Sequence, residues 1–178
     1  MVKLDFLSVL DEKAQFLNDF SDDIWANPET AFTEFHAAGR YCSVLRSEGF
    51  EVTENLAGIP TAFSGRFGSG HPVIGVLAEF DALSGLSQEG GVTEKRSAGV
   101  ACGHGCGHNL LGTASLGAAI AIKSGVKSAA EAAKMIGVGL QSFCIDGSVA
   151  EDRKVGLGHG NLGAMLLSDA VSYTHLTL

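Results

Sequence analysis

The chain has 178 residues, 46% of them hydrophobic, and a formal net charge of −8 at pH 7. This size is enough for one domain with a hydrophobic core, or for part of a larger one. The negative charge, without a basic run or a bilayer-long apolar stretch, argues against nucleic-acid and membrane partners. The first residues lack the apolar run of a signal peptide, so we expect the four cysteines to be reduced thiols in the cytoplasm.

Two amphipathic helices are predicted at the start of the chain. Apolar residues recur at helical spacing over residues 4–26. Asn27 and Pro28 end this pattern, because the residue before a proline is disfavoured in the α region. A second helix is predicted over residues 33–48, and Gly49 follows it as a C-terminal stop.

Three strands are predicted next, over residues 50–54, 61–67 and 73–78. The third is a continuous apolar run, which is typical of a central strand of an α/β sheet, covered on both faces. In such sheets the functional site lies beyond the carboxyl ends of the strands. Glu79 and Asp81 stand there. They are therefore candidates for metal binding or acid–base chemistry, with a solvated strand end as the alternative.

A glycine-rich segment over residues 99–109 (GVACGHGCGHN) holds Cys102, His104, Cys106 and His108 at alternating positions. Thiolate and imidazole are the natural ligands of zinc. If the segment is extended, the four side chains project to the same face. Two interpretations stay open: two of the four bind a metal that other parts of the fold complete, or the segment is a structural turn before a helix over residues 110–123.

Four blocks of the sequence resemble the M20 metallopeptidases. They are residues 25–29 (WANPE), 58–61 (GIPT), 77–83 (LAEFDAL) and 103–109 (GHGCGHN). Their order and spacing are similar to the amidohydrolase branch that includes aminobenzoyl-glutamate utilisation protein B, over about residues 3–123. The resemblance implies an α/β fold, in which this chain is an incomplete fragment of a layered metallohydrolase catalytic domain.

The same resemblance implies a hydrolase with two divalent ions, zinc or manganese, that cleaves an amide bond of an N-acyl amino acid or peptide-like small molecule. Intact members of the family are often homodimers. Cys106 and His108 match the family's metal-binding Cys and His, and Asp81 matches the acidic residue that supports the metal site in catalysis. Three further side chains are expected to orient these ligands: Glu79, His104 and Asn109, the last where the family more often has Asp.

The sequence departs from the family further along. M20 hydrolases use a Glu-Glu pair after the helix that follows the Cys/His motif, one Glu as general base and the other as a metal ligand. This sequence contains no Glu-Glu. We therefore do not expect efficient catalysis by this chain alone.

Residues 116–170 resemble the bacterial GGGtGRT proteins, whose function is not established, and residues 171–178 (VSYTHLTL) resemble a translated sequencing adapter. These similarities predict a chimera of three parts: an M20-like part over residues 1–123, a helical and glycine-rich segment over 124–170, and a non-native tail over 171–178. Composition alone predicts an alanine-rich helix over residues 128–140.

Two other functions remain open from the residues alone. One is a non-catalytic structural module in which Cys102, His104, Cys106 and His108 hold a metal together. The other is a cysteine nucleophile that His104 or His108 activates.

Overall fold

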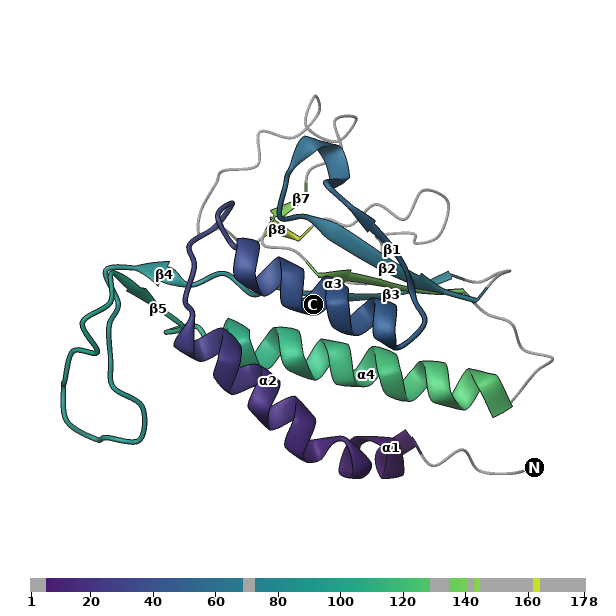
Figure 1. Cartoon of the computed structure of the whole chain (residues 1–178), viewed down its shortest axis with the longest axis horizontal. Helices are drawn as coiled ribbons and strands as arrows, with labels where there is room; N and C mark the ends of the chain where they lie inside the picture. The colour runs from purple at the N-terminus through teal and green to yellow at the C-terminus, as the bar shows by residue number, and fades with distance from the viewer. Residues whose placement is uncertain (1–5, 69–72, 129–134, 141–142, 145–161, 164–178) are drawn as a thin grey trace, which may run out of the picture.

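The computed structural model describes residues 6–68, 73–128, 135–140, 143–144 and 162–163 (Figure 1). The helices are α1 (Phe6–Glu12), α2 (Ala14–Ala26), α3 (Phe35–Ser47) and α4 (His108–Ser128), with a 3-10 turn η1 (Leu56–Gly58). The strands are β1 (Glu51–Glu54), β2 (Phe63–Phe67), β3 (Val73–Ala78), β4 (Leu83–Ser84), β5 (Cys102–Gly103), β6 (Met135–Leu140), β7 (Phe143–Cys144) and β8 (Leu162–Gly163). The α/β fold class is thus confirmed.

The predicted helices are confirmed, with one refinement. The first is broken into α1 and α2 at Lys13. The end of α3 is closed by Gly49, which has a φ of +83°, and by a hydrogen bond from the amide of Phe50 to the carbonyl of Leu45. Among the described residues, none of the helices has the length and apolar character that a bilayer span requires.

The main sheet has the strand order β1-β2-β6-β3. Strand β2 pairs antiparallel with β1 on one side and with β6 on the other. Strands β6 and β3 are parallel, with Leu140 opposite Ala78. All three predicted strands are present. However, β3 is not central in the described part of the sheet, because it pairs only with β6, and the Leu77 side chain remains 43% exposed.

Strand β6 corrects the helix predicted over residues 128–140, which is wrong for residues 135–140. Two glycines and the β-branched Ile136 and Val138 lower the helix propensity of this stretch. The position between β2 and β3 offers backbone hydrogen bonds on both edges. A strand of the segment predicted as separate and helical therefore belongs to the same sheet as β2 and β3. The predicted boundary at residue 123 falls inside α4, and the predicted tail over 171–178 lies outside the described residues.

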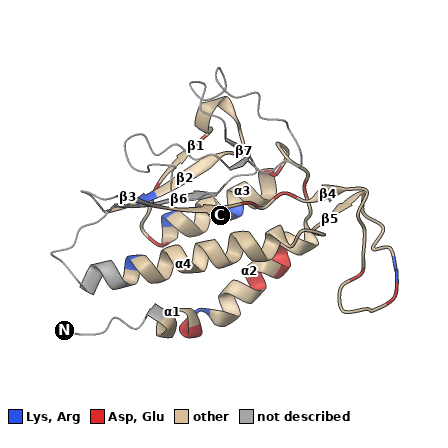
Figure 2. Cartoon of the chain, turned by 180° about the vertical axis from the view of Figure 1, so that it is seen from behind, with Lys and Arg blue, Asp and Glu red and all other residues tan. Residues whose placement is uncertain are grey.

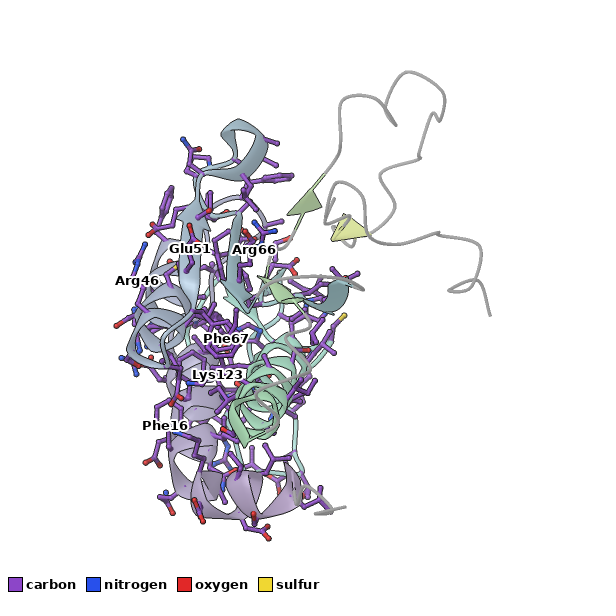
Figure 3. The ribbon with its side chains drawn as sticks, turned by 90° about the vertical axis from the view of Figure 1, so that its right-hand side faces the viewer. Phe16, Arg46, Glu51, Arg66, Phe67 and Lys123 are labelled. Carbon is purple, nitrogen blue, oxygen red and sulfur yellow. The ribbon has the colours of Figure 1, made fainter. Side chains whose placement is uncertain are left out.

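Helices α3 and α4 cover the same face of this sheet. The α-carbon of Gly65 in β2 faces Leu45 of α3, whose Cδ1 atom lies 3.0 Å from where a Cβ would stand. Two residues along the strand, the Phe67 ring lies 5.8 Å from Nζ of Lys123 in α4 (Figure 3). Because alternate residues of a strand share a face, both helices pack on one side. Helices α1 and α2 in turn pack against α4 (Figure 1).

An aromatic cluster forms the core between these layers. The ring of Tyr41 lies 4.7 Å from that of Phe20 and 5.2 Å from that of Phe80, and Phe80 lies 5.7 Å from Phe63. All four side chains are buried. Phe80 stands between Glu79 and Asp81 in the sequence. Its burial therefore anchors the backbone at the carboxyl end of β3.

The exposed side of α1 and α2 is acidic (Figure 2). The exposed acidic residues of these helices are Asp11, Glu12, Asp19 and Asp22. This surface accounts for part of the net charge of −8.

Candidate metal centre

Two segments meet at the carboxyl end of β3. Glu79 and Asp81 follow this strand directly, and His108 is the first residue of α4. The short strands β4 and β5 pair antiparallel, with Leu83 opposite Gly103. This pairing brings the chain after β3 next to the chain before α4, although the two are well separated in sequence.

The His108 ring lies between two carboxylates. Its Nδ1 atom is 2.8 Å from Oδ1 of Asp81 and 3.1 Å from the Asp81 carbonyl oxygen, and its Nε2 atom is 3.0 Å from Oε2 of Glu79. His108 and Asp81 are buried, and Glu79 is half-buried. One possible ligand atom from each of these three residues lies within 4.8 Å of the other two. In the described part of the chain, no other group of three His, Cys, Asp or Glu residues is as close together.

The carboxylates and the imidazole perturb one another. The hydrogen bond to Asp81 raises the pKa of His108, although burial of the ring acts against it. Burial raises the pKa of Glu79; the nearby Asp81 charge adds to this effect, while His108 opposes it. A carboxylate that accepts the Nδ1 proton also leaves the Nε2 lone pair free for a metal, which is the usual arrangement of metal-binding histidines. Oxygen and imidazole donors suit zinc and manganese, so this group fits a divalent ion.

The Cys/His segment does not gather into one set of ligands. The Cys102 thiol donates to the Pro28 carbonyl at 3.1 Å, and Nε2 of His104 lies 3.1 Å from the Ile24 carbonyl. Both therefore reach the end of α2 and the connection that follows it. Of the four predicted donors, only His108 joins Glu79 and Asp81.

Cys106 is exposed and lies outside the group of three. The segment around it turns rather than continuing as a strand, with the amide of Gly107 donating to the His104 carbonyl and a Gly107 φ of +72°. Because of this turn, residues two apart no longer share a face. The role of Cys106 as a metal ligand stays a prediction.

His104 and Asn109 are buried against α2. Nδ2 of Asn109 donates to Oγ of Ser21 at 3.0 Å. Burial lowers the pKa of His104, so its ring is neutral at pH 7. That His104 and Asn109 orient the metal ligands stays a prediction; their hydrogen bonds to Ile24 and Ser21 fasten α2 to the loop before α4.

A close approach of α3 and α4 lies directly beneath this group. A Cβ on Gly112 would overlap the Tyr41 hydroxyl, and it would lie 2.9 Å from Cζ of that ring and 3.0 Å from the Glu79 carbonyl oxygen. Sequence reasoning gave Gly112 no role. A glycine inside an otherwise good helix was the available signal.

The connection between α2 and α3 was also missed as a support for the centre, although residues 25–29 form one of the blocks that carry the resemblance. The amide of Ala82 donates to the Glu29 carbonyl at 2.7 Å, and Thr30 forms a β-bridge with Ala82. The residue after Asp81 is therefore held by this connection.

Comparisons with known proteins give two kinds of match. Residues 80–176 match the family model described as GGGtGRT protein, starting earlier than the predicted 116. A component of the p-aminobenzoyl-glutamate hydrolase of Escherichia coli (strain K12) is 53% identical over 110 residues, which cover 61% of this chain and 23% of that protein. Human Xaa-Arg dipeptidase is 31% identical over 145 residues, 74% of this chain and 28% of that protein. The chain thus spans about a quarter of the length of these curated relatives.

A solved structure shares the fold. It is the Bacillus subtilis YXEP protein, a dinuclear metal-binding peptidase of the M20 family, with a TM-score of 0.54 and 20% identity over 71% of this chain and 34% of that one. The predicted resemblance to M20 hydrolases and to GGGtGRT proteins is thereby confirmed. The described part of the chain has part of the α/β fold of the M20 peptidase structure.

Proposed function

This chain belongs to the GGGtGRT protein family through residues 80–176. We propose that it carries part of the metal-binding site of a metal-dependent amide hydrolase. Its substrate class is an N-acyl amino acid or a peptide-like small molecule, and its metal is zinc or manganese. The observation that carries the proposal is the His108 imidazole held between Asp81 and Glu79 at the carboxyl end of β3. The E. coli relative supports the substrate class, because p-aminobenzoyl-glutamate is itself an N-acyl amino acid.

In this proposal His108 and Glu79 bind the ion, and Cys106 contributes its exposed thiolate from the preceding turn. Asp81 is buried against Nδ1 of His108, so it acts as a positioning residue: it keeps the proton on Nδ1 and makes Nε2 more basic. A divalent ion held here would supply Lewis acidity for the amide carbonyl of the substrate. The missing Glu-Glu pair leaves the general base unassigned, so we expect metal binding with little turnover.

The test is a metal titration of the metal-free full chain with zinc and with manganese, measured by competition with a chromogenic chelator. We expect stoichiometric binding that His108→Gln abolishes and that Asp81→Asn weakens about 10- to 100-fold. His36→Gln is the matched control, because the His36 ring also pairs with a carboxylate, that of Asp23, but is not part of the group of three. Unchanged affinity in His108→Gln would refute the proposal.

Two further experiments, one of them on a variant, separate the alternatives. If Cys102→Ser loses the metal as completely as His108→Gln, the structural Cys/His module replaces the hydrolase. If the metal-free chain is alkylated rapidly at Cys106 and hydrolyses p-aminobenzoyl-glutamate without metal, the cysteine-nucleophile function replaces the metal-dependent one. Metal-dependent hydrolysis, even slow, supports the proposal.

A further inference from the structure

Helix α3 has its N-terminus capped by a residue from outside the helix. The residue at the cap position, Glu34, makes no side-chain cap bond; it accepts a hydrogen bond from the Thr61 hydroxyl instead. The carboxylate of Glu29 takes over the cap. Its Oε1 accepts the amide of His36 at 2.9 Å and its Oε2 accepts the amide of Ala37 at 3.0 Å. These are the two amides that a capping side chain normally satisfies, and a negative charge there is also favoured by the helix dipole.

The backbone of the same residue holds the chain beside the metal centre. The Glu29 carbonyl accepts the amide of Ala82 at 2.7 Å. Ala82 follows Asp81, whose carboxylate and carbonyl oxygens both contact Nδ1 of His108. An unbroken series of hydrogen bonds and one peptide unit thus joins the start of α3 to the His108 ring.

Other contacts to the connection between α2 and α3 do not replace this one. The Cys102 thiol and the His104 ring bond to carbonyls of Pro28 and Ile24, which lie before Glu29. By these two bonds they fasten the loop before α4 to Pro28 and to the end of α2. Within the described residues, Glu29 and Thr30 make the backbone contacts that join this connection to Ala82.

We propose that Glu29 is a positioning residue of the metal centre: by fixing residues 29–30 on the N-terminus of α3, its carboxylate sets the place of Asp81 and so the orientation of His108. This inference rests on the proposed function for its effect on metal affinity. Its effect on the metal-free His108 ring is independent of that function.

The test uses Glu29→Ala and Glu29→Gln in the full chain, with Glu54→Gln as matched control. Glu54 pairs with Arg46 of α3 but lies on β1, away from the centre. Two properties are measured: the imidazole ¹⁵N and ¹H shifts of His108 and the hydrogen-exchange protection of the Ala82 amide in the metal-free chain, and the zinc affinity. In Glu29→Ala we expect altered His108 shifts, lost Ala82 protection and about 10-fold weaker zinc binding. Glu29→Gln, which keeps one acceptor oxygen, is expected to lie between Glu29→Ala and the natural chain.

A purely structural cap would lower the melting temperature and leave the His108 shifts and Ala82 protection of Glu29→Gln at their natural values. That result would overturn the inference, even if Glu29→Ala does not fold. If the natural chain binds no zinc, the proposed function fails, while the metal-free NMR comparison still decides the role of Glu29.

Discussion

Replacing Gly112 by alanine tests how closely α3 and α4 pack beneath the metal centre. In an exposed helix this change stabilises by about 1 kcal/mol, because glycine loses more backbone entropy on folding. Here the new methyl group would overlap the Tyr41 hydroxyl and lie 3.0 Å from a backbone oxygen, that of Glu79. Tyr41 is 0% exposed, so its ring has no room to move aside.

Overpacking of a core costs about 1–3 kcal/mol, and we expect the upper end because a buried ring and backbone form the obstacle. After the propensity gain, the net loss of stability is about 2 kcal/mol. For a chain of this size, that lowers the melting temperature by about 4–8 °C. Thermal unfolding followed by circular dichroism measures it. Because Glu79 must also shift, zinc affinity should fall in the same variant.

Gly39→Ala in α3 is the control. A Cβ at Gly39 would meet nothing within 4 Å, so this variant should gain the helix propensity and unfold at a higher temperature. Adding Tyr41→Phe to Gly112→Ala removes the overlapping hydroxyl and should recover part of the loss. If Gly112→Ala is stabilised as much as Gly39→Ala, the close approach of α3 and α4 is wrong.

Three further outcomes are expected. Lys123→Met should destabilise the chain by about 2 kcal/mol in urea unfolding, because the buried ammonium of Lys123 is bonded to Glu48. Burial tends to raise the pKa of Glu48, but hydrogen bonds from Lys13 and Lys123 outweigh it and lower that pKa. The stabilisation that the ionised Glu48 carboxylate contributes is therefore complete above pH 4.5, and it is lost as the pH falls through the lowered pKa of Glu48. Urea unfolding midpoints that stay flat from about pH 5 to 3 would contradict this. Burial raises the pKa of Cys42 to about 12, so mass spectrometry after iodoacetamide at about pH 8 should find Cys106 modified and Cys42 intact until the chain unfolds.

Local patterns predicted the regular elements well. The helical spacing before Pro28, the stop at Gly49 and the apolar run of β3 are properties of neighbouring residues, and each appears in the structure. Strand β6 was mispredicted because its conformation depends on β2 and β3, which lie far earlier in the chain and offer it two edges. The local composition of residues 135–140 disfavours a helix, but no local pattern identifies the two strands that pair with it.

The candidate site was predicted in part for the same reason. Glu79 and Asp81 were found from their position after a strand, and His108 from its motif. That His104 and His108 point to different partners was not predictable from alternation, because the turn at Gly107 breaks the extended geometry on which alternation depends. The cap on α3 by Glu29 joins residues seven and eight apart across an irregular connection, a spacing with no regular sequence signature.

The strand order β1-β2-β6-β3 also constrains how the chain folds. β2 and β3 are neighbours in sequence but not in the sheet, because β6 separates them. The edge of β2 that faces β6, residues 63–67, can therefore pair only after residues 136–140 are in place. Such high contact order makes folding slow, and on the ribosome it delays closure of the sheet until α4 and β6 have both emerged. Until then the facing edges of β2 and β3 are open, and the nascent chain is most exposed to pairing with other chains at that stage.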